Sequence, residues 1–388
     1  MDYSKVLNPE VVGLAPSGIR KFFDIAANMT DVISLGVGEP DFPTPWHIRQ
    51  AGIEAIQDKK TRYTSNWGLA ELRAEVADYM KRRFSLEYRS ESEIVISVGG
   101  SEAIDGAVRA IVGAGDEVII PQPSFVCYDP ITRLAGGVPV PLETFEEDEF
   151  RITADALRAA ITDKTKLLIL PYPCNPTGAV MDTEHLEEIA EVLRGTDIMI
   201  LSDEIYAELT YGSKHVSIAT LDGMWERTVV IGGFSKTYSM TGWRLGYACG
   251  PAPVLAQMLK IHQFAIMSAP TVSQYAAIEA LRNGDSDIQK MLEQYDMRRR
   301  IMVDGFNKLG LSCFEPRGAF YAFPCIRSSG LSSDEFCEKL LYSHNVALVP
   351  GNAFGACGEG FVRASYCYSV GHIKAALERI SDFLKEIK

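Results

Sequence analysis

The chain has 388 residues, of which 38 are Lys or Arg and 51 are Asp or Glu, so its formal net charge is −13. Its composition, 47% hydrophobic and 23% charged, is typical of a folded globular protein. It excludes intrinsically disordered chains, collagen-like chains and small disulfide-rich scaffolds. The acidic balance argues against nucleic acid as a partner, because that binding depends on Lys and Arg. The length predicts about two to three domains.

The sequence has no apolar run long enough for a membrane span, and its N-terminus does not resemble a signal peptide. Its 8 cysteines form no C-x-x-C pair and no zinc-like spacing with histidine. We therefore expect a cytoplasmic protein with reduced cysteines, no metal site, and neither a membrane nor nucleic acid as a partner.

Short apolar stretches with strand character alternate with amphipathic stretches of helical period over much of the chain. The predicted strands are residues 94–98, 117–120, 166–170, 197–201 and 228–231. Such strands, separated by helices, are typical of a mostly parallel sheet that is covered on both faces. Ligands bind these sheets beyond the carboxyl ends of the strands. Each of the five strands ends in a polar, Gly-rich or Pro-rich cluster, so we expect a functional site there.

The pattern changes after about residue 285. The expected elements are a long charged helix over Ser286–Leu309, a helix from Ser332, a strand near Val346–Val349 and a final helix over His372–Ile387. They predict a smaller α+β domain. We expect a large domain over residues 31–285, the small domain over 286–388, and an N-terminal segment, residues 1–30, that packs with the small domain.

Lys236 gives the strongest chemical signal. It follows the predicted strand at 228–231, with Ser235 directly before it and Arg244 shortly after it. A lysine in this setting suits a covalent cofactor that carries a carbonyl group and a phosphate. Its amine would form the Schiff base, while Ser235 and Arg244 would hold the phosphate. The plain alternative is a surface lysine at the end of a strand.

Asp203 follows another buried strand, at 197–201. Its carboxylate could pair with a protonated pyridine nitrogen, and Tyr206 could reach the phenolic oxygen of the same ring. An apolar run that ends in Asp-Glu is also compatible with a magnesium site of a nucleotide hydrolase. That interpretation requires a G-x-x-x-x-G-K-[ST] loop, which the sequence does not contain.

The segment Gly99–Ala103 supplies backbone N–H groups at the start of a predicted helix, which suits a phosphate. The same residues fit the G-x-S-x-A turn of serine hydrolases, so a hydrolase with Ser101 as nucleophile is an alternative from another enzyme class. It requires a histidine later in the chain. The candidates, which lie in no distinctive setting, are His215, His262, His344 and His372.

Three further residues have both a functional and a structural interpretation. Asn175 belongs to the segment Asn-Pro-Thr-Gly, whose structural interpretation is a turn. In the functional interpretation, its amide donates to a ring oxygen and to a substrate carboxylate. Phe125 stacks on a flat ring or belongs to the core. Arg363, which lies between apolar residues, binds a carboxylate with its two-pronged guanidinium or forms a structural salt bridge.

Several motifs occur in one order along the chain: Leu35–Phe42, Tyr63–Arg73, Asn175–Gly178, Ser202–Tyr206, Ser235-Lys236, Thr241–Arg244 and Gly318–Tyr321. Together they resemble the class I/II, fold-type I aminotransferases that depend on pyridoxal phosphate, and the resemblance covers essentially the whole chain. It implies an α/β fold, the fold type I of PLP-dependent transferases. The large domain would hold a mostly parallel seven-stranded sheet, beside a smaller α+β domain.

The resemblance also implies roles for individual residues. Lys236 would be the Schiff-base lysine and proton shuttle, and Asp203 would bind the pyridine nitrogen. The other contacts with the ring would come from Tyr206, Asn175 and Phe125. The phosphate would be held by Gly100, Ser101, Glu102, Ser235, Arg244 and, from the partner subunit, Tyr63. The substrate carboxylate would be bound by Arg363, Asn175 and the backbone of Gly38. The active unit would be a homodimer with shared active sites.

The reaction implied is amino-group transfer from an L-amino acid to a 2-oxo acid such as 2-oxoglutarate. The chain is similar to a prokaryotic subgroup of aspartate, aromatic and N-acetyl-diaminopimelate aminotransferases. Ser101 stands where some aspartate enzymes carry lysine, and no second arginine for a distal carboxylate is evident around residues 263–273. We therefore expect aromatic or N-acylated donors to be preferred to aspartate, with Arg20 as the candidate for a distal carboxylate. A C–S β-lyase of the same fold is the nearer alternative.

Overall fold

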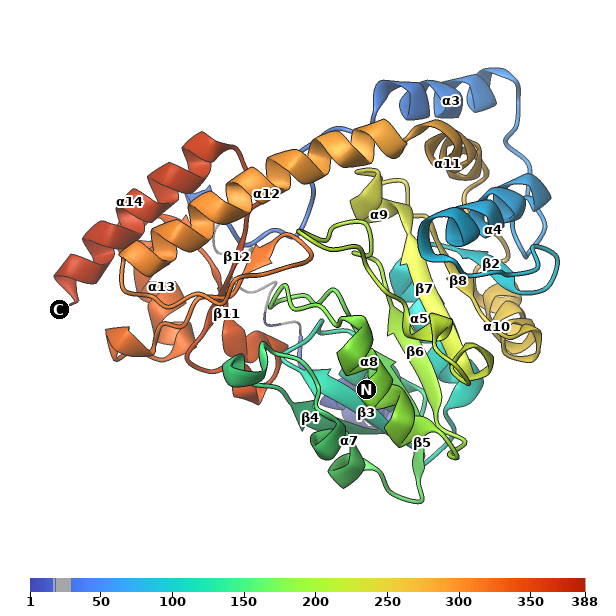
Figure 1. The fold of residues 1–388 in the computed structure, drawn as a ribbon, viewed down its shortest axis with the longest axis horizontal. Helices are drawn as coiled ribbons and strands as arrows, with labels where there is room; N and C mark the ends of the chain where they lie inside the picture. The colour runs from blue at the N-terminus through green and yellow to red at the C-terminus, as the bar shows by residue number, and fades with distance from the viewer. Residues whose placement is uncertain (17, 19–28, 388) are drawn as a thin grey trace.

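The computed structural model describes residues 1–16, 18 and 29–387. Figure 1 shows two parts, a larger one built on a long sheet and a smaller one that ends with the C-terminus, with a long helix reaching across both. Within the described residues the large sheet has seven strands. In spatial order they are β2 (Ile94–Ser97), β8 (Gly246–Cys249), β7 (Thr228–Gly233), β6 (Met199–Asp203), β5 (Thr165–Leu170), β3 (Glu117–Gln122) and β4 (Val138–Glu143).

The sheet is mostly parallel, and the predicted α/β fold class is confirmed. Only β8, among the strands of this sheet that the structure describes, runs against its neighbours β2 and β7. The other neighbouring pairs are parallel. All five predicted strands exist, but the one expected at 197–201 begins at Met199 and ends at Asp203. Ser202 and Asp203 thus belong to the strand, paired with β7, and do not follow it.

Both faces of the sheet are buried, as the apolar strands predict. In β5 the side chains of Leu167 and Ile169 pack with α5 (Gly100–Ile111) and α10 (Ala252–Ala265) on one face. The alternate residues Leu168 and Leu170 pack on the other face with α8 (Thr183–Leu193). The remaining helices of this part are α3 (Trp46–Gln57), α4 (Ala70–Phe84), α6 (Tyr128–Leu134), α7 (Ala154–Ala160), α9 (Phe234–Thr237) and α11 (Thr271–Asn283).

The smaller part contains α12 (Asp285–Lys308), α13 (Ser333–His344) and α14 (Val370–Glu386) around short strands. Strands β11 (Val349–Pro350), β12 (Val362–Ser365) and β9 (Tyr321–Ala322) form an antiparallel sheet. The strand expected near 346–349 is two strands, because β10 (Val346–Ala347) pairs instead with β1 (Ile33–Ser34). Helix α13 begins after Ser332, whose side chain forms a capping box with Glu335.

The N-terminal residues contact both parts. Helix α1 (Pro9–Gly13) lies beside α6 of the larger part, whereas β1 joins the smaller part through β10. Residues 17 and 19–28 lie outside the described part of the chain. The boundaries at residues 30 and 285, and the assignment of the whole segment 1–30 to the small domain, stay predictions.

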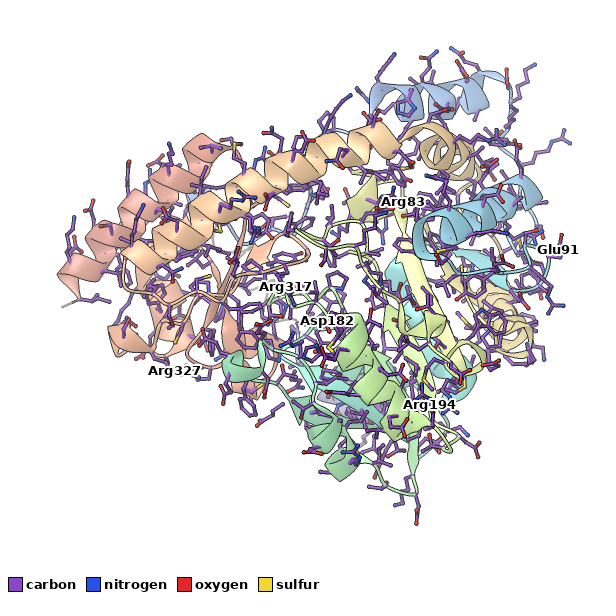
Figure 2. All side chains as sticks on the ribbon, in the orientation of Figure 1. Arg83, Glu91, Asp182, Arg194, Arg317 and Arg327 are labelled. Carbon is purple, nitrogen blue, oxygen red and sulfur yellow. The ribbon has the colours of Figure 1, made fainter. Side chains whose placement is uncertain are left out.

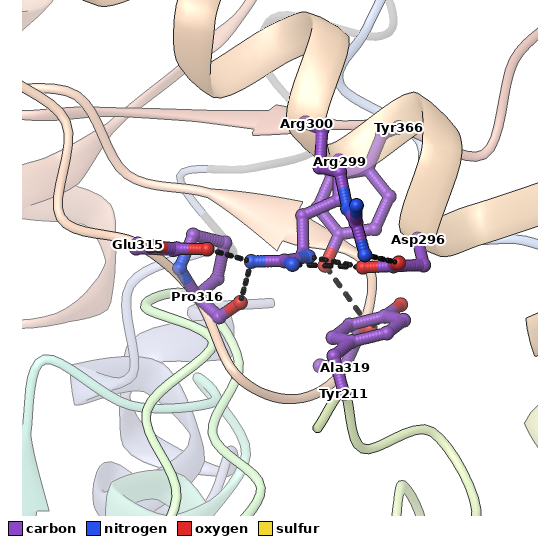
Figure 3. A network of polar contacts seen from close by, with 8 residues as sticks. All are labelled: Tyr211, Asp296, Arg299, Arg300, Glu315, Pro316, Ala319 and Tyr366. Atoms are coloured by element: carbon purple, nitrogen blue, oxygen red, sulfur yellow. Dashed lines mark hydrogen bonds and ion pairs between the residues drawn. The ribbon is translucent and has the colours of Figure 1, made fainter.

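Two sets of ion pairs, each with one buried member, fix the segments that approach the sheet edge. Arg83, at the end of α4 and labelled in Figure 2, donates from Nε to Glu208 at 2.7 Å, and Tyr79 donates to the same carboxylate at 2.7 Å. This pair holds the segment after β6. Figure 3 shows the second, in which Arg299 of α12 donates to Glu315 and Asp296, each at 2.7 Å. It fixes the chain just before β9.

The backbone carbonyl of Ala319 is the other centre in Figure 3. It accepts from the Tyr211 hydroxyl at 2.6 Å and from the Tyr366 hydroxyl at 3.2 Å. The segment Gly318–Tyr321 is therefore held at once by the segment after β6 and by the residue that follows β12. Among the described residues, no helix is both long and apolar enough to cross a membrane.

His47 of α3 joins α11 and α12 where the two parts meet. Its ring nitrogens lie 2.7 Å from Glu279 and 3.0 Å from Asp287. Burial alone would lower the pKa of His47, but the hydrogen bonds to these two carboxylates raise it above the ordinary 6.5. A group whose pKa is higher in the folded state stabilises the fold fully below the unfolded pKa and loses this effect as pH rises through the folded pKa.

We predict that His47→Gln lowers stability below pH 6.5 and has progressively less effect as the pH rises above that value. The difference should not exceed about 1 kcal/mol, since the side chain is 34% exposed and water screens the pair. Urea unfolding of both proteins between pH 5.5 and 8.5, at roughly unit steps of pH, checks this. A difference that is independent of pH would contradict it.

Candidate active site

A cavity of about 410 Å³ opens where the large sheet ends. Strands β2, β3, β5, β6 and β7 run in one direction, so their carboxyl ends meet at the same edge. The cavity brings together most of the residues predicted from the sequence: Gly38, Gly100, Ser101, Phe125, Asn175, Asp203, Tyr206, Ser235, Lys236, Arg244 and Arg363. Residues far apart in the chain thus line one space, as the positions of the strand ends predict.

Two of the predicted residues that the structure describes do not line this cavity. The carboxylate of Glu102 accepts from the backbone of Val98 at 2.9 Å and lies 3.1 Å from Nδ1 of His262, so its side chain is bound on another side of α5. Tyr63 is 83% exposed on the surface of the chain. Arg20 lies outside the described residues.

Lys236 lies on α9, directly after β7, and its amine reaches into the cavity. Nζ donates to the carbonyl of Gly38 at 2.7 Å. Burial lowers the pKa of this amine to about 8, and the nearby guanidinium groups of Arg363 and Arg244 act in the same direction. A lysine with this pKa is deprotonated to a useful extent near neutral pH, so it can serve as nucleophile or base.

Asp203, the last residue of β6, is buried and lines the cavity. Its Oδ1 accepts from the backbone N–H of Ile205 at 3.2 Å, and its Oδ2 accepts from the hydroxyl of Tyr128 at 2.7 Å. Burial raises the pKa of the carboxyl group, and the two hydrogen bonds act against this rise. The result is a fixed carboxylate, suited to a positively charged partner in the cavity.

An anion cradle lies at the N-terminus of α5. Gly99 precedes this helix with a φ of +82°, and a Cβ placed on it would lie 2.8 Å from Nη2 of Arg244. The guanidinium therefore lies directly against the helix start. Ser101 and Ser235 line the same corner. A helix N-terminus, a guanidinium and hydroxyl groups together suit a phosphate.

Arg363 of β12 also lines the cavity. Nη1 donates to Oδ1 of Asn175 at 2.9 Å, and Nη2 donates to the carbonyl of Gly36. Because Oδ1 of Asn175 is bound to Arg363, the amide nitrogen is the end that remains for another acceptor. Nε of Arg363 is buried and has no hydrogen-bond partner among the described residues. This pair suits a carboxylate.

Sequence reasoning missed two tyrosines of the site. Tyr321 lines the cavity, its hydroxyl lies 2.9 Å from that of Tyr206, and its ring lies 4.5 Å from the guanidinium carbon of Arg363. Tyr321 ends the motif Gly318–Tyr321, so the sequence does carry a signal for it. Tyr128, which binds Asp203, begins a helix in ordinary surroundings and gave no signal.

The residues present fit pyridoxal phosphate. The amine of Lys236, the carboxylate of Asp203 and the cradle at Gly99 match the aldehyde, the ring nitrogen and the phosphate of that cofactor. The serine hydrolase is not favoured, because no histidine from the described part of the chain lines the cavity beside Ser101. His215 and His262 instead pair with Glu204 and Glu102.

We predict that Lys236→Met stabilises the cofactor-free protein at pH 7. Its folded pKa of about 8 is below the ordinary 10.5, so burial of the charged amine costs up to about 3 kcal/mol below pH 8. Between pH 8 and 10.5 the unfolded chain binds more protons, so the native protein gains stability with rising pH and the difference should shrink. Guanidinium unfolding of both proteins measures it; the same difference at both ends of this range would contradict the lowered pKa.

The comparisons with known proteins agree with this geometry. The family model for aminotransferase class I and II matches residues 30–380. An aspartate aminotransferase of Pyrococcus abyssi is 46% identical over 96% of this chain and 97% of that protein. A Bacillus subtilis protein named "Probable N-acetyl-LL-diaminopimelate aminotransferase" is 45% identical over 98% of this chain and 96% of its own length.

A solved structure extends the agreement to three dimensions. The aromatic aminotransferase of Pyrococcus horikoshii OT3 superposes with a TM-score of 0.90 at 43% identity, covering 95% of this chain and 99% of that one. Sequence and structure thus match over nearly the whole length of each relative. The resemblance inferred from the motifs is confirmed: the chain is an enzyme that belongs to the aminotransferase class I and II family.

Proposed function

We propose that this aminotransferase holds pyridoxal phosphate in the cavity and uses it to move an amino group from an L-amino acid to a 2-oxo acid such as 2-oxoglutarate. One observation carries the proposal. A buried amine with a lowered pKa, Lys236, and a buried carboxylate, Asp203, line the same cavity, next to the anion cradle. The family and its relatives support the reaction class.

Bound pyridoxal phosphate supplies an aldehyde that binds amino groups covalently and a ring that takes up the electrons of a broken Cα–H bond. Lys236 would remove the proton from the substrate Cα and deliver it to the carbon of the cofactor's aldehyde group, because its amine is the base with a suitable pKa. Asp203 holds a proton on the ring nitrogen. Tyr206 and Asn175 donate to the ring oxygen, and Phe125 stacks against the ring.

The cofactor phosphate and the substrate α-carboxylate are bound by different residues of the cavity. The backbone N–H groups of the Gly100–Glu102 turn, the hydroxyls of Ser101 and Ser235, and the guanidinium of Arg244 hold the phosphate. Arg363 binds the substrate α-carboxylate through its guanidinium, together with the Asn175 amide nitrogen and the backbone of Gly38. Each of these two sets of residues would therefore bind one anionic group, the first on the cofactor and the second on the substrate.

The charges of the cavity bear on the donor. Its lining cations within the described residues are Lys236, Arg244 and Arg363, and each has a role above. Burial of an unpaired distal carboxylate costs several kcal/mol. We therefore propose an aromatic or N-acylated donor rather than aspartate, with Arg20 as the residue that meets the distal carboxylate of glutamate in the return reaction. The name of the Pyrococcus abyssi relative, an aspartate aminotransferase, weighs against this preference.

The alternatives have less support. Elimination by a C–S β-lyase would use the same fold, but the relatives reported above are named aminotransferases. A hydrolase built on Ser101 would need a histidine beside it, and the described lining of the cavity contains none. A cytoplasmic location stays a prediction.

A panel of donors against 2-oxoglutarate tests the function. We expect keto acids to form from phenylalanine, tyrosine and N-acetyl-diaminopimelate, with kcat/KM for aspartate about 10²-fold or more lower. Lys236→Ala should abolish transfer while circular dichroism shows an intact fold. Pyruvate release without an acceptor would indicate a lyase. A tenfold advantage for aspartate would contradict the donor preference, and full turnover by Lys236→Ala would contradict the mechanism.

Tyr63 supports a homodimer with shared sites. It is 83% exposed, and Phe264, near the C-terminal end of α10, is 88% exposed. Large aromatic side chains exposed in this way favour a protein interface. The loop that carries Tyr63 is tied to the start of α11, since Thr271 donates to the carbonyl of Arg62 at 2.7 Å. We propose that Tyr63 reaches the phosphate bound by the partner subunit.

A mixed dimer tests this arrangement. In a heterodimer of Tyr63→Phe and Lys236→Ala subunits, one site keeps Lys236. If Tyr63 acts across the interface, that site receives an intact Tyr63 and should bind the cofactor with wild-type affinity. If Tyr63 acts within its own subunit, that site loses one hydrogen bond to a charged group, and its affinity should fall by about tenfold or more. Cofactor titration of the purified heterodimer distinguishes the two.

A further inference from the structure

Tyr128 is a buried residue next to the site that the proposed mechanism does not use. It is the first residue of α6 and is 2% exposed. Its hydroxyl donates to Oδ2 of Asp203 at 2.7 Å, across 75 positions of sequence. Its ring meets Phe125 edge-on, with the centroids 6.1 Å apart. One short segment therefore contacts Asp203 and supplies the aromatic wall of the cavity.

The hydrogen bonds on Asp203 limit how its carboxylate can turn. Ile205 holds Oδ1 from the backbone and Tyr128 holds Oδ2 from the side chain. Donors on both oxygens favour the ionised form of a carboxyl group whose pKa burial raises. Burial also raises the pKa of Tyr128 well above 10, so its hydroxyl keeps its proton and remains a donor.

We propose that Tyr128 is a positioning residue: through its hydrogen bond it keeps Asp203 ionised and oriented toward the ring nitrogen of the bound cofactor. The inference rests on the proposed function, in which Asp203 faces that nitrogen. Without the hydroxyl, Asp203 is a stronger base in a buried setting. The proton shared with the ring nitrogen then moves toward the carboxylate, and the attraction between the two groups weakens.

The test compares two cofactors that differ at one atom: pyridoxal phosphate and the analogue with CH in place of the ring nitrogen. Both carry the same aldehyde and phosphate, so contacts other than the one with Asp203 cancel. In Tyr128→Phe, the dissociation constant for pyridoxal phosphate should rise by about tenfold or more, the effect of one hydrogen bond to a charged group. The constant for the analogue should change by less than about twofold.

Tyr172→Phe is the matched control. Its hydroxyl is also buried, but it binds the backbone of Phe150 at 3.0 Å and of Ile152 at 3.2 Å, and it does not line the cavity. This variant should affect both cofactors equally. A second readout is the nitrogen-15 signal of the bound ring, which in Tyr128→Phe should move toward the position of an unprotonated pyridine. A purely structural role would not move it.

Each other outcome overturns the inference. Equal losses for both cofactors in Tyr128→Phe would mean that the hydroxyl serves only the fold. Unchanged affinities and an unchanged nitrogen signal would mean that it has no role. If the wild-type protein binds both cofactors equally, then Asp203 does not contact the ring nitrogen. If it binds neither, then the cavity does not hold the cofactor. In either case the proposed function fails first, and the role of Tyr128 fails with it.

Discussion

The guanidinium of Arg363 is the buried charge on which the joint between the two parts depends. It belongs to β12 of the small sheet, yet it donates to Asn175 after β5 and to the carbonyl of Gly36 near the N-terminus. Its central carbon lies 4.5 Å from the ring centroid of Tyr321 and 4.8 Å from that of Phe354. A buried charge without partners destabilises a protein strongly, so these segments must come together at once. The contact that joins the two parts is therefore also a wall of the site.

The cavity keeps two further charged groups away from water, and their burial has opposite effects. It lowers the pKa of the Lys236 amine and raises that of the Asp203 carboxyl group. Both shifts mean that the ionised form costs free energy in the folded state. The sheet beneath them offsets this cost, because side chains such as Leu167 and Leu168 are fully buried on its two faces. The buried strands therefore stabilise the fold, whereas the reactive groups lie at the carboxyl ends of the strands.

The sequence predicted the strands that carry the site, because an apolar run followed by Gly, Pro or a charge is a local pattern. It missed β8 and β4. Strand β8 reads Gly-Tyr-Ala-Cys, without the β-branched residues that mark β2, Ile-Val-Ile-Ser, so its strand pattern is weak. Strand β4 reads Val-Pro-Val-Pro-Leu-Glu, and proline normally argues against a strand. It is tolerated here because β4 lies at the edge of the sheet, where one side needs no hydrogen bonds.

The reactive groups also have a local sequence pattern, whereas the groups that orient them do not. Lys236 and Asp203 interrupt apolar runs, so the sequence alone identifies them as candidates. Tyr128 meets Asp203 across 75 positions, and Tyr321 meets Tyr206 across 115. An aromatic side chain in an apolar segment looks like core until the fold brings its hydroxyl to a partner. Motifs therefore locate acids and bases, whereas the hydrogen bonds that set their pKa values and directions come from contacts that only the folded chain makes.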